Sequence, residues 1–212
     1  MIVVGLTGNY GMGKSTVSKM FSEHGAVTMD SDAIVGELLN EPEVIDEIIK
    51  AFGEDIVRDN SINRKMLADI VFGSPPLRIS LENILHPRVF SKIEQRLSEL
   101  LLTGSGVLVV IEVPLLYERG YQNRFDRIIT VYTPEETALQ NLLRKGVTED
   151  DALKRLKNQF PIAMKISRSD YSIDNSHGLN DTREQVARIY RELAALEKCG
   201  IRSVSGNIHG NN

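Results

Sequence analysis

The sequence predicts an α/β protein whose core is a five-stranded, mostly parallel β-sheet with helices on both faces. Two observations lead to this fold class: short apolar runs alternate with longer helical patterns, and a glycine-rich turn follows the first run. The strand-like runs span residues 2–6, 26–29, 107–111, 127–132 and 171–173. Strands that alternate with helices favour parallel pairing, because parallel neighbours need a crossover connection between them.

The helices follow from their apolar faces and their first residues. The helix after the glycine-rich turn has one apolar face, formed by Val17, Met20 and Phe21. The last helix has an apolar face of the same spacing, formed by Val186, Ile189, Tyr190 and Leu193. Thr148, followed by acidic residues, is expected to cap another helix, and Asp181 with Glu184 resembles a capping box at the start of the last one.

A long helical stretch, residues 33–106, separates the second strand from the third, and it is longer than one crossover helix requires. We expect an inserted helical lobe there. Its prolines are expected to separate individual helices, and they are Pro42, Pro75, Pro76 and Pro87. Residues 203–212, rich in Ser, Gly and Asn, are expected to be a disordered tail.

Residues 8–15 read Gly-Asn-Tyr-Gly-Met-Gly-Lys-Ser and fit the pattern of a phosphate-binding loop between a strand and a helix. Gly8, Gly11 and Gly13 allow positive φ, so that backbone N–H groups can turn toward phosphates beside the unpaired donors of the next helix. Lys14 can place its ammonium between the β- and γ-phosphates, and the Ser15 hydroxyl can bind Mg²⁺. The sequence therefore predicts nucleoside triphosphate binding; the alternative is a glycine-rich turn without a ligand.

Composition excludes several other classes of protein. A net charge of −4 and a pI near 5.6 argue against a general nucleic-acid-binding protein, which usually carries a basic face. The one cysteine, Cys199, cannot form an intramolecular disulfide, and the four histidines lack zinc-ligand spacing. We expect no signal peptide, no membrane span and a reducing, cytoplasmic setting.

Residues 144–168 form a basic segment in this acidic chain, since seven Lys or Arg minus three Asp or Glu give a local charge of +4. Phosphoryl transfer needs cations on the γ-phosphoryl and the exclusion of water, so this segment is a candidate lid over the phosphates. The alternative is a solvated helix face, which charge runs usually are.

Carboxylates follow two of the predicted strands. Asp30 and Asp32 end the second strand, and in an extended backbone both would point the same way, so that one can orient an attacking hydroxyl at the carboxyl edge of the sheet. The alternative is that Asp30 caps the next helix and Asp32 lies in its acidic first turn. Glu112 ends the third strand, where it can hold Mg²⁺ through water or be a simple strand-end charge.

With these features the chain closely resembles the dephospho-CoA kinase family, from Val4 to about Val186. The shared motifs occur in family order, and they are Gly5-Leu6-Thr7-Gly8, Asp30-Ser31-Asp32, Phe52-Gly53 with Asn63-Arg64, Leu85-His86-Pro87, Val113-Pro114-Leu115-Leu116-Tyr117-Glu118, Gln159 with Pro161 and Lys165, and Ser169-Asp170 before Ile173-Asp174-Asn175. The resemblance implies a three-layer P-loop kinase fold with an acceptor-binding lobe and a lid. It also implies transfer of the γ-phosphoryl of ATP, with Mg²⁺, to the ribose 3′-hydroxyl of dephospho-coenzyme A, the last step of coenzyme A biosynthesis.

Site residues are likewise implied by the resemblance. The catalytic residues would be Asp32, as base or orienting group, with Lys14 and Arg144. Those that bind ATP would be Gly11, Met12, Gly13, Lys14, Ser15, Thr16, Arg144 and Asn175. Those that bind the acceptor would be Thr7, Asp32, Arg64, His86, Pro114, Leu115 and Leu116. A structural role at a helix junction is equally compatible with His86, because Pro87 follows it.

The resemblance also implies a division into domains. A nucleotide-binding core would comprise residues 1–32 and 105–198, with the lid at about 136–168, and residues 33–104 would form the acceptor-binding (CoA) lobe. The chain departs from the usual family pattern at a few positions, which are Asn9, Tyr10 and Met12 in the loop, Glu112 in place of Asp, and Gly36 where Arg is frequent. Glu112 is one methylene longer than Asp, which changes the reach of any metal contact.

Three other functions stay open at this point. A GTPase switch would usually contain Asn-Lys-x-Asp and Asp-x-x-Gly motifs, and the sequence contains neither. Another small-molecule P-loop kinase, with a nucleoside or nucleotide as acceptor, would share the fold and the loop. A catalytically silent nucleotide-binding module would bind ATP without transferring its phosphoryl group. The expected partners are ATP and dephospho-coenzyme A, with no nucleic acid and no membrane; protein partners are not specified by the sequence.

Overall fold

The computed structural model describes residues 1–58, 61–102 and 107–199, so the tail expected at 203–212 lies outside the described residues. The chain divides into two compact units. Met1–Met29 and Thr103–Asn212 form the first unit, and Asp30–Leu102 forms the second. No helix in the described parts of the chain is both long and apolar enough to cross a membrane.

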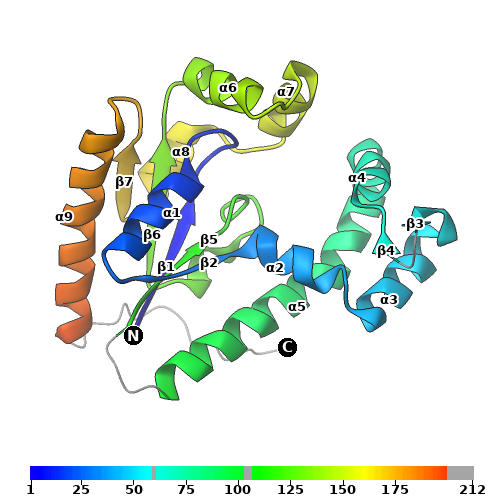
Figure 1. The fold of residues 1–212 in the computed structure, drawn as a ribbon, viewed down its shortest axis with the longest axis horizontal. Coiled ribbons are helices and arrows are strands. Elements are labelled where there is room, and N and C mark those ends of the chain that lie inside the picture. The colour runs from blue at the N-terminus through cyan, green and yellow to red at the C-terminus, as the bar shows by residue number, and fades with distance from the viewer. Residues whose placement is uncertain (59–60, 103–106, 200–212) are drawn as a thin grey trace. The chain divides into compact units, whose positions relative to one another are not determined.

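The first unit is built on a five-stranded sheet with the strand order β2-β5-β1-β6-β7 (Figure 1). Its strands are β1 (Ile2–Thr7), β2 (Val27–Asp30), β5 (Leu108–Glu112), β6 (Arg127–Tyr132) and β7 (Tyr171–Asp174). β1 pairs in parallel with β5 and β6, and β6 pairs in parallel with β7. The α/β class and the five strands expected from the sequence are therefore confirmed, and both ends of each strand lie within one residue of the apolar run that predicted it.

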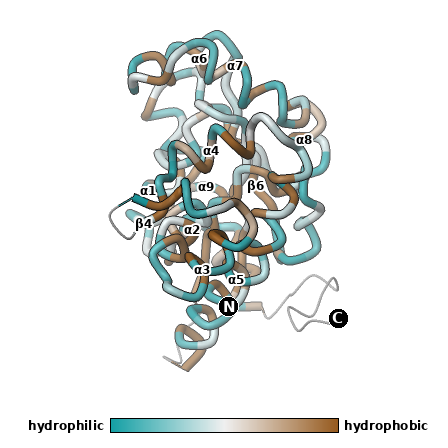
Figure 2. Tube along the Cα trace, turned by 90° about the vertical axis from the view of Figure 1, so that its right-hand side faces the viewer, coloured by the Kyte–Doolittle hydropathy of each residue, from teal (hydrophilic) through white to brown (hydrophobic). Residues whose placement is uncertain are grey.

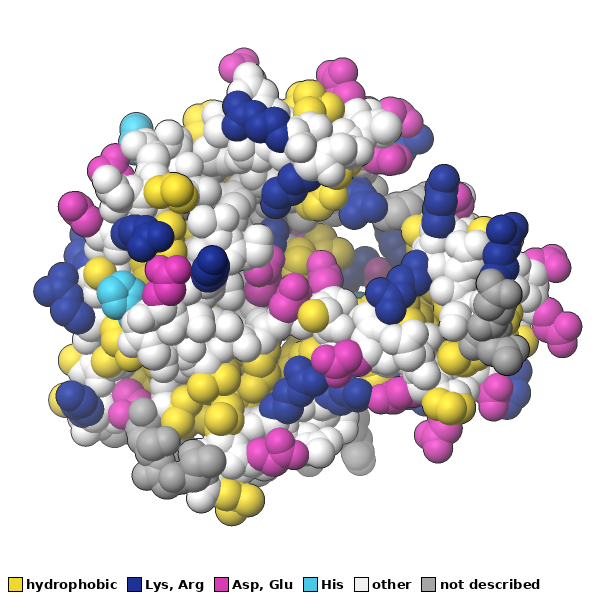
Figure 3. Space-filling view, in the orientation of Figure 1, with side chains coloured by type: hydrophobic (Ala, Val, Ile, Leu, Met, Phe, Trp, Pro, Cys, Tyr) yellow, Lys and Arg dark blue, Asp and Glu magenta, His cyan; other side chains and the backbone are white. Residues whose placement is uncertain are grey.

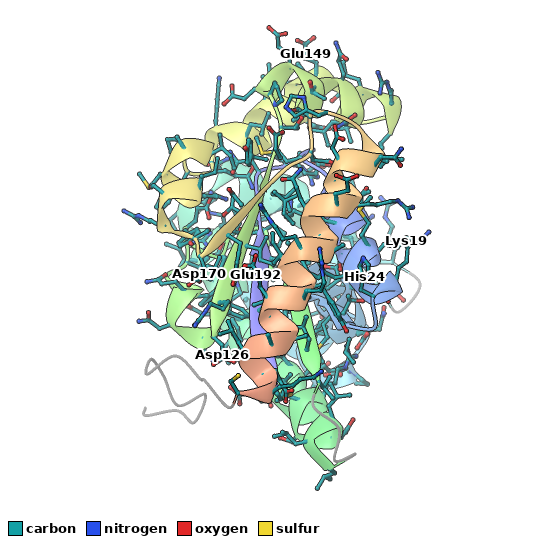
Figure 4. All side chains as sticks on the ribbon, turned by 90° about the vertical axis from the view of Figure 1, so that its left-hand side faces the viewer. Lys19, His24, Asp126, Glu149, Asp170 and Glu192 are labelled. Atoms are coloured by element: carbon teal, nitrogen blue, oxygen red, sulfur yellow. The ribbon has the colours of Figure 1, made fainter. Side chains whose placement is uncertain are left out.

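One face of this sheet is covered by α1 (Lys14–Glu23) and α9 (Leu179–Lys198). The apolar faces predicted for these helices are buried against alternate residues of β1, and the residues involved include Val17, Met20, Phe21, Val186, Ile189, Leu193, Ile2, Val4 and Leu6. Figure 4 shows α9, in orange, in front of the strands, with His24 of the turn after α1 beside it. The ring of His24 stacks on that of Tyr190 in α9, with centroids 5.4 Å apart.

The other face of β1 is packed by the segment that follows β5. Gly5 alternates with the residues that face α1 and α9, so it lies on the opposite face. A Cβ at Gly5 would lie 2.7 Å from Leu116 Cδ1 and 3.0 Å from Phe125 Cδ2. The absence of a side chain at this position therefore lets Leu116 and Phe125 approach the sheet directly.

Acidic side chains close the amino end of the sheet. Asp126 Oδ2 accepts a hydrogen bond of 2.9 Å from the Val3 N–H, and Asp170 Oδ2 accepts one of 2.8 Å from the Ile128 N–H. Figure 4 labels both aspartates, which lie well away from Glu149 of α7. They satisfy backbone donors in the first residues of β1 and β6.

The remaining helices of the first unit follow β6 and are α6 (Glu135–Arg144), α7 (Glu149–Lys157) and α8 (Ile162–Arg168), with a short 3₁₀ helix η2 (Tyr121–Arg124) before β6. Thr148 caps α7 as predicted, because its Oγ1 accepts the Asp151 N–H at 3.3 Å. The predicted capping box at α9 is wrong: the helix begins at Leu179 after Gly178, so Asp181 and Glu184 lie inside it.

The second unit consists mainly of helices. These are α2 (Ser31–Leu38), α3 (Pro42–Phe52), α4 (Arg64–Gly73) and α5 (Pro75–Leu102), joined by a 3₁₀ helix η1 (Glu54–Ile56) and the antiparallel pair β3 (Val57–Arg58) and β4 (Ser61–Ile62). Helix α5 packs against α2, α3 and α4 and buries Leu85, Val89, Ile93 and Leu97. Pro42 and Pro75 begin helices, as their missing N–H favours.

Pro87 does not separate helices, contrary to the prediction, because α5 continues through it. Proline in a helix interior removes one backbone hydrogen bond, a local cost that tertiary contacts can offset. Such contacts follow Pro87 closely: Lys92 pairs with Glu41 at 2.6 Å and Arg96 with Glu37 at 2.7 Å. Apolar residues are buried on both sides of Pro87, with Leu85 before it and Val89 after it, so both halves of α5 are packed.

Candidate active site

Segments that follow four neighbouring strands meet at the carboxyl end of the sheet. The loop of residues 8–13 follows β1, the turn of residues 114–120 follows β5, α6 follows β6, and Asn175 follows β7. In parallel sheets this edge is where ligands bind, because the strand ends and the helix N-termini face it together.

The three loop glycines have the backbone conformation that the sequence predicted. Their φ angles are +146° at Gly8, +82° at Gly11 and +92° at Gly13. Two of them also permit a close approach. A Cβ at Gly11 would lie 2.5 Å from the Ala138 carbonyl oxygen in α6, and one at Gly13 would overlap the Asn175 side chain. Glycine is therefore required here both by conformation and by the neighbours that pack against the loop.

Protein donors bind the loop's carbonyl groups. Asn141 Nδ2 donates to the Gly11 carbonyl at 3.3 Å, and Asn175 Nδ2 donates to the Met12 carbonyl at 3.2 Å. The Asn9 carbonyl accepts from Lys14 Nζ and from the Met12 N–H, both at 3.3 Å. Carbonyl oxygens held in this way are kept from facing an anion, which favours phosphate binding by the N–H groups of the loop.

Helix α1 begins directly at Lys14, with Gly13 as its N-cap. Its first turn contains no acidic residue, so nothing in that turn neutralises the positive end of the helix dipole. Lys14 is buried, whereas Ser15 and Thr16 are exposed in the same turn. The predicted phosphate-binding residues 11–16 are therefore gathered at one helix N-terminus.

The segment before α8 lies against the outer part of the loop. Asn9 Nδ2 donates to the Phe160 carbonyl at 3.2 Å, and the Tyr10 N–H donates to Gln159 Oε1 at 2.8 Å. The Arg155 guanidinium of α7 lies 5.0 Å from the centre of the Tyr10 ring, a cation–π contact. From the sequence, Gln159 was recognised only as part of a motif. Asn141 was not predicted, because no local pattern indicates its contact with the loop.

The basic segment of residues 144–168 is not one uniform surface. Figure 2 shows a largely hydrophilic trace at α6 and α7, and Figure 3 shows Lys and Arg mixed with Asp and Glu over these helices. Arg144 is exposed at the end of α6, one turn after Asn141, which binds the loop. Lys165, in contrast, is fully buried in α8 and pairs with Glu118 at 2.7 Å, so it belongs to no lid surface.

Asn175 uses both ends of its side-chain amide inside the protein. Its Nδ2 holds the Met12 carbonyl, and its Oδ1 accepts a hydrogen bond of 3.0 Å from the Thr182 hydroxyl of α9. The residue therefore supports the phosphate loop from the end of β7, and Thr182 fixes its orientation. Sequence reasoning did not single out Thr182.

The predicted acceptor residues of the first unit lie at the end of β1 and in the turn after β5. Thr7, fully buried at the end of β1, donates its hydroxyl to the Pro114 carbonyl at 3.3 Å. Leu116 is fully buried against Gly5, whereas Pro114 and Leu115 are half-buried. Glu112 is the last residue of β5, opposite Leu6 of β1, so it lies beside the start of the phosphate loop.

The second unit contains the other predicted acceptor residues. β2 ends at Asp30, whose Oδ1 accepts the Asp32 N–H at 2.9 Å and caps α2. The prediction that Asp30 and Asp32 share one extended strand is therefore wrong, because a helix begins at Ser31 and Asp32 lies in its first turn. Arg64, at the start of α4, donates to the Gly36 carbonyl in α2 at 2.7 Å, one helical turn beyond Asp32. His86 is half-buried within α5 and not at a junction between helices.

Replacing Gly13 by Ala tests the packing of the phosphate loop. The added Cβ would overlap Asn175, so the loop or Asn175 must move; we expect turnover with ATP to fall about 100-fold, as a misplacement near 1 Å costs. Gly120→Ala is the matched control, because its φ is +70° but nothing lies within 4 Å of its Cβ position. The control is expected to lose only about 1 kcal/mol of stability. Equal kinetics for both variants would contradict the prediction.

The chain matches known proteins along nearly its whole length. The family model for dephospho-CoA kinase matches residues 2–181. A dephospho-CoA kinase of Aquifex aeolicus is 38% identical over 90% of this chain and 96% of its own length. One of Carboxydothermus hydrogenoformans is 37% identical over 90% of this chain and 93% of its own.

Solved structures agree with these relatives. TT1252 from Thermus thermophilus superposes with a TM-score of 0.81 at 30% identity, covering 92% of this chain and 97% of its own. Dephospho-CoA kinase from Campylobacter jejuni has a TM-score of 0.68 at 26% identity, and the match covers 94% of this chain and 98% of that one. Shikimate kinase from Acinetobacter baumannii shares the fold alone, at 18% identity and a TM-score of 0.53. That match covers 92% of this chain and 94% of the shikimate kinase. With its phosphate loop, five-stranded sheet and motifs, the chain belongs to the dephospho-CoA kinase family and is an ATP-dependent kinase.

Proposed function

We propose that this chain transfers the γ-phosphoryl of ATP to the ribose 3′-hydroxyl of dephospho-coenzyme A, with residues 11–16 as its phosphate site. The phosphate site rests on the loop after β1, where positive-φ glycines, and carbonyl groups bound by Asn141 and Asn175, leave N–H groups for the phosphates. The N-terminus of α1 adds its unpaired donors and its dipole. The choice of acceptor rests on membership of the dephospho-CoA kinase family.

Lys14 and Arg144 are the cations that stabilise negative charge on the phosphoryl group during its transfer. The Lys14 ammonium is held by the Asn9 carbonyl at 3.3 Å, so it lies at the loop before nucleotide arrives. Phosphoryl transfer is catalysed mainly by positioning and by charge stabilisation, so a preorganised cation at this point lowers the barrier. Arg144 follows Asn141 by one turn of α6, which supports its role as a cation supplied from the lid at about 136–168.

Asp32 is the proposed base or orienting group for the acceptor hydroxyl. Asp30 is committed to capping α2, because its carboxylate accepts the Asp32 N–H, which makes Asp32 the better candidate of the two. Arg64, bound to α2 one turn further on, supports recognition of an anionic acceptor by the same helix. We assign acceptor binding to the unit formed by Asp30–Leu102, with His86 as a contributor, and to Pro114 and Leu115 of the first unit.

Mg²⁺ would be held by the Ser15 hydroxyl and, through water, by Glu112. Ser15 is exposed in the first turn of α1, and Glu112 ends β5 beside the strand that leads into the loop. One hydroxyl and one carboxylate suit an ion that keeps several waters and takes its other ligands from substrate phosphates. When bound, the ion would neutralise charge on the β- and γ-phosphates.

The setting we propose is cytoplasmic, with ATP and dephospho-coenzyme A as partners and no nucleic acid. The net charge of −4 supports the exclusion of nucleic acid as a general ligand. The exposed Cys199, with no second cysteine in the chain to pair with, is compatible with a reducing compartment.

Lys14→Ala is expected to lower kcat by about 100- to 1000-fold, by analogy with the loss of one preorganised donor. Lys19→Ala is the matched control, because Lys19 is an exposed residue of the same helix (Figure 4). The control should keep normal steady-state kinetics. A folded Lys14→Ala enzyme with near-normal turnover would remove the loop lysine from the mechanism.

Asp32→Asn is expected to reduce kcat by at least about 100-fold while ATP affinity changes little, because a positioned base contributes that much and the phosphates are held elsewhere. Asp30→Asn is the control, since Asn caps helices as well as Asp does. Calorimetric ATP binding and turnover should be measured for both variants. A larger kinetic defect in Asp30→Asn would reverse the assignment, and loss of ATP binding in Asp32→Asn would indicate a different role for that residue.

The acceptor itself is tested by mass spectrometry of the products. With ATP and Mg²⁺, dephospho-coenzyme A should gain one phosphate, with an equal amount of ADP formed. Adenosine, uridine, nucleoside monophosphates and shikimate should react poorly, because a lobe as large as the second unit serves to recognise a long acceptor. Phosphorylation of a nucleoside in preference to dephospho-coenzyme A would overturn the proposed acceptor and leave the kinase class standing.

A further inference from the structure

A buried ion pair lies next to the phosphate loop in the first unit. Lys165 of α8 is fully buried, and its Nζ lies 2.7 Å from Glu118 Oε1, whose side chain is only 7% exposed. Burial lowers the pKa of Lys165, and the Glu118 carboxylate acts in the opposite direction. Removing two charges from water is costly, so such a pair needs further hydrogen bonds to be compatible with a folded core.

The further bonds of this pair go to backbone groups at the site. Lys165 Nζ donates to the Pro114 carbonyl at 3.3 Å, the same carbonyl that accepts the Thr7 hydroxyl. Glu118 Oε1 accepts the Phe160 N–H at 2.8 Å. One ion pair therefore fixes the turn after β5 and the segment before α8.

That segment in turn holds the phosphate loop. The Phe160 carbonyl accepts from Asn9 Nδ2, and Gln159 Oε1 accepts from the Tyr10 N–H. A continuous chain of bonds thus begins at Thr7, just before the loop, passes through Pro114, the ion pair and residues 159–160, and ends inside the loop. We name this chain the loop clamp, with its members Thr7, Pro114, Glu118, Gln159, Phe160 and Lys165.

Stability does not account for the pair. Apolar residues of similar volume at the two positions would be expected to give an equally or more stable core, whereas losing one partner alone would be strongly destabilising. What apolar side chains cannot supply is a bond to the Pro114 carbonyl and another to the Phe160 N–H. The consequence specific to the charged pair is therefore the geometry of the two backbone segments.

We propose that Lys165 and Glu118 are positioning residues, whose ion pair holds the phosphate loop and the Pro114 turn in the arrangement that phosphoryl transfer requires. The proposal rests on the proposed function, in which that loop binds ATP and that turn contacts the acceptor. Neither residue is expected to touch the reacting atoms. Their effect is on how well the groups that do so are aligned.

The test is the double variant Lys165→Met/Glu118→Leu, compared with the single variant Glu118→Leu. The single variant leaves a buried ammonium without its partner, so it should lose both thermal stability and activity. The double variant removes both charges but leaves the Phe160 N–H without its acceptor, so it should melt near the wild-type temperature and well above the single variant. Its kcat/KM should nevertheless fall by about 100-fold, the loss that misplacement by about 1 Å produces.

Controls separate positioning from stability. Arg183→Gln/Glu23→Gln removes the exposed ion pair between α9 and α1, whose atoms lie 3.3 Å apart, and should leave both melting and kinetics unchanged. Gln159→Leu leaves the ion pair intact but removes the bond to the Tyr10 N–H. Its kcat/KM should fall at wild-type stability, and this variant decides the question if the double variant does not fold.

The outcomes are distinct. A stable double variant with wild-type kcat and KM for both substrates would overturn the positioning role, as would a fully active Gln159→Leu enzyme where the double variant does not fold. A wild-type protein that leaves dephospho-coenzyme A unphosphorylated would instead contradict the proposed function. A stable double variant with impaired kcat/KM supports the clamp, because a purely structural pair would regain activity together with stability.

Discussion

A loop that binds phosphates must offer its N–H groups to the ligand and direct its carbonyl oxygens elsewhere, and the first unit is organised around this constraint. The carbonyl groups of Gly11 and Met12 are taken by Asn141 and Asn175, which come from α6 and from the end of β7. These partners can reach the loop only because parallel strands bring their carboxyl ends to one edge. The sheet therefore positions the residues that hold the loop, as well as the loop itself.

Residues that depart from the usual family pattern take part in the same arrangement. The Asn9 side chain binds the Phe160 carbonyl, and the Tyr10 ring makes a cation–π contact with Arg155. Met12 is fully buried. These side chains tie the loop to α7 and to the segment before α8, where smaller residues would make fewer contacts. Backbone phosphate binding is compatible with the changes, because the glycines that set the loop conformation are present.

Local patterns and tertiary context account for different parts of the molecule. Strands and the phosphate loop were predictable because each depends on a few adjacent residues with strong preferences. Pro87 and Asp181 show the limit of such reasoning. A proline that would end an isolated helix lies inside α5, where apolar packing and ion pairs hold both halves, and the last helix begins at Leu179, before the expected capping box. Asp32 is a similar case, because α2 already begins at Ser31, so Asp32 lies in a helix and not in an extended strand.

The sequence by itself determined the α/β class, the order of the strands along the chain, the phosphate loop and the family, because each of these is encoded in contiguous motifs. Only the tertiary structure decided the partners of that loop. Gly11 is hydrogen-bonded to Asn141, Met12 to Asn175 and Asn9 to Phe160. Lys165, which the sequence places in a basic segment with other cations, is buried against Glu118. These contacts join residues far apart in sequence, so they depend on which strand ends become neighbours in the sheet, and no local preference of a single residue specifies that.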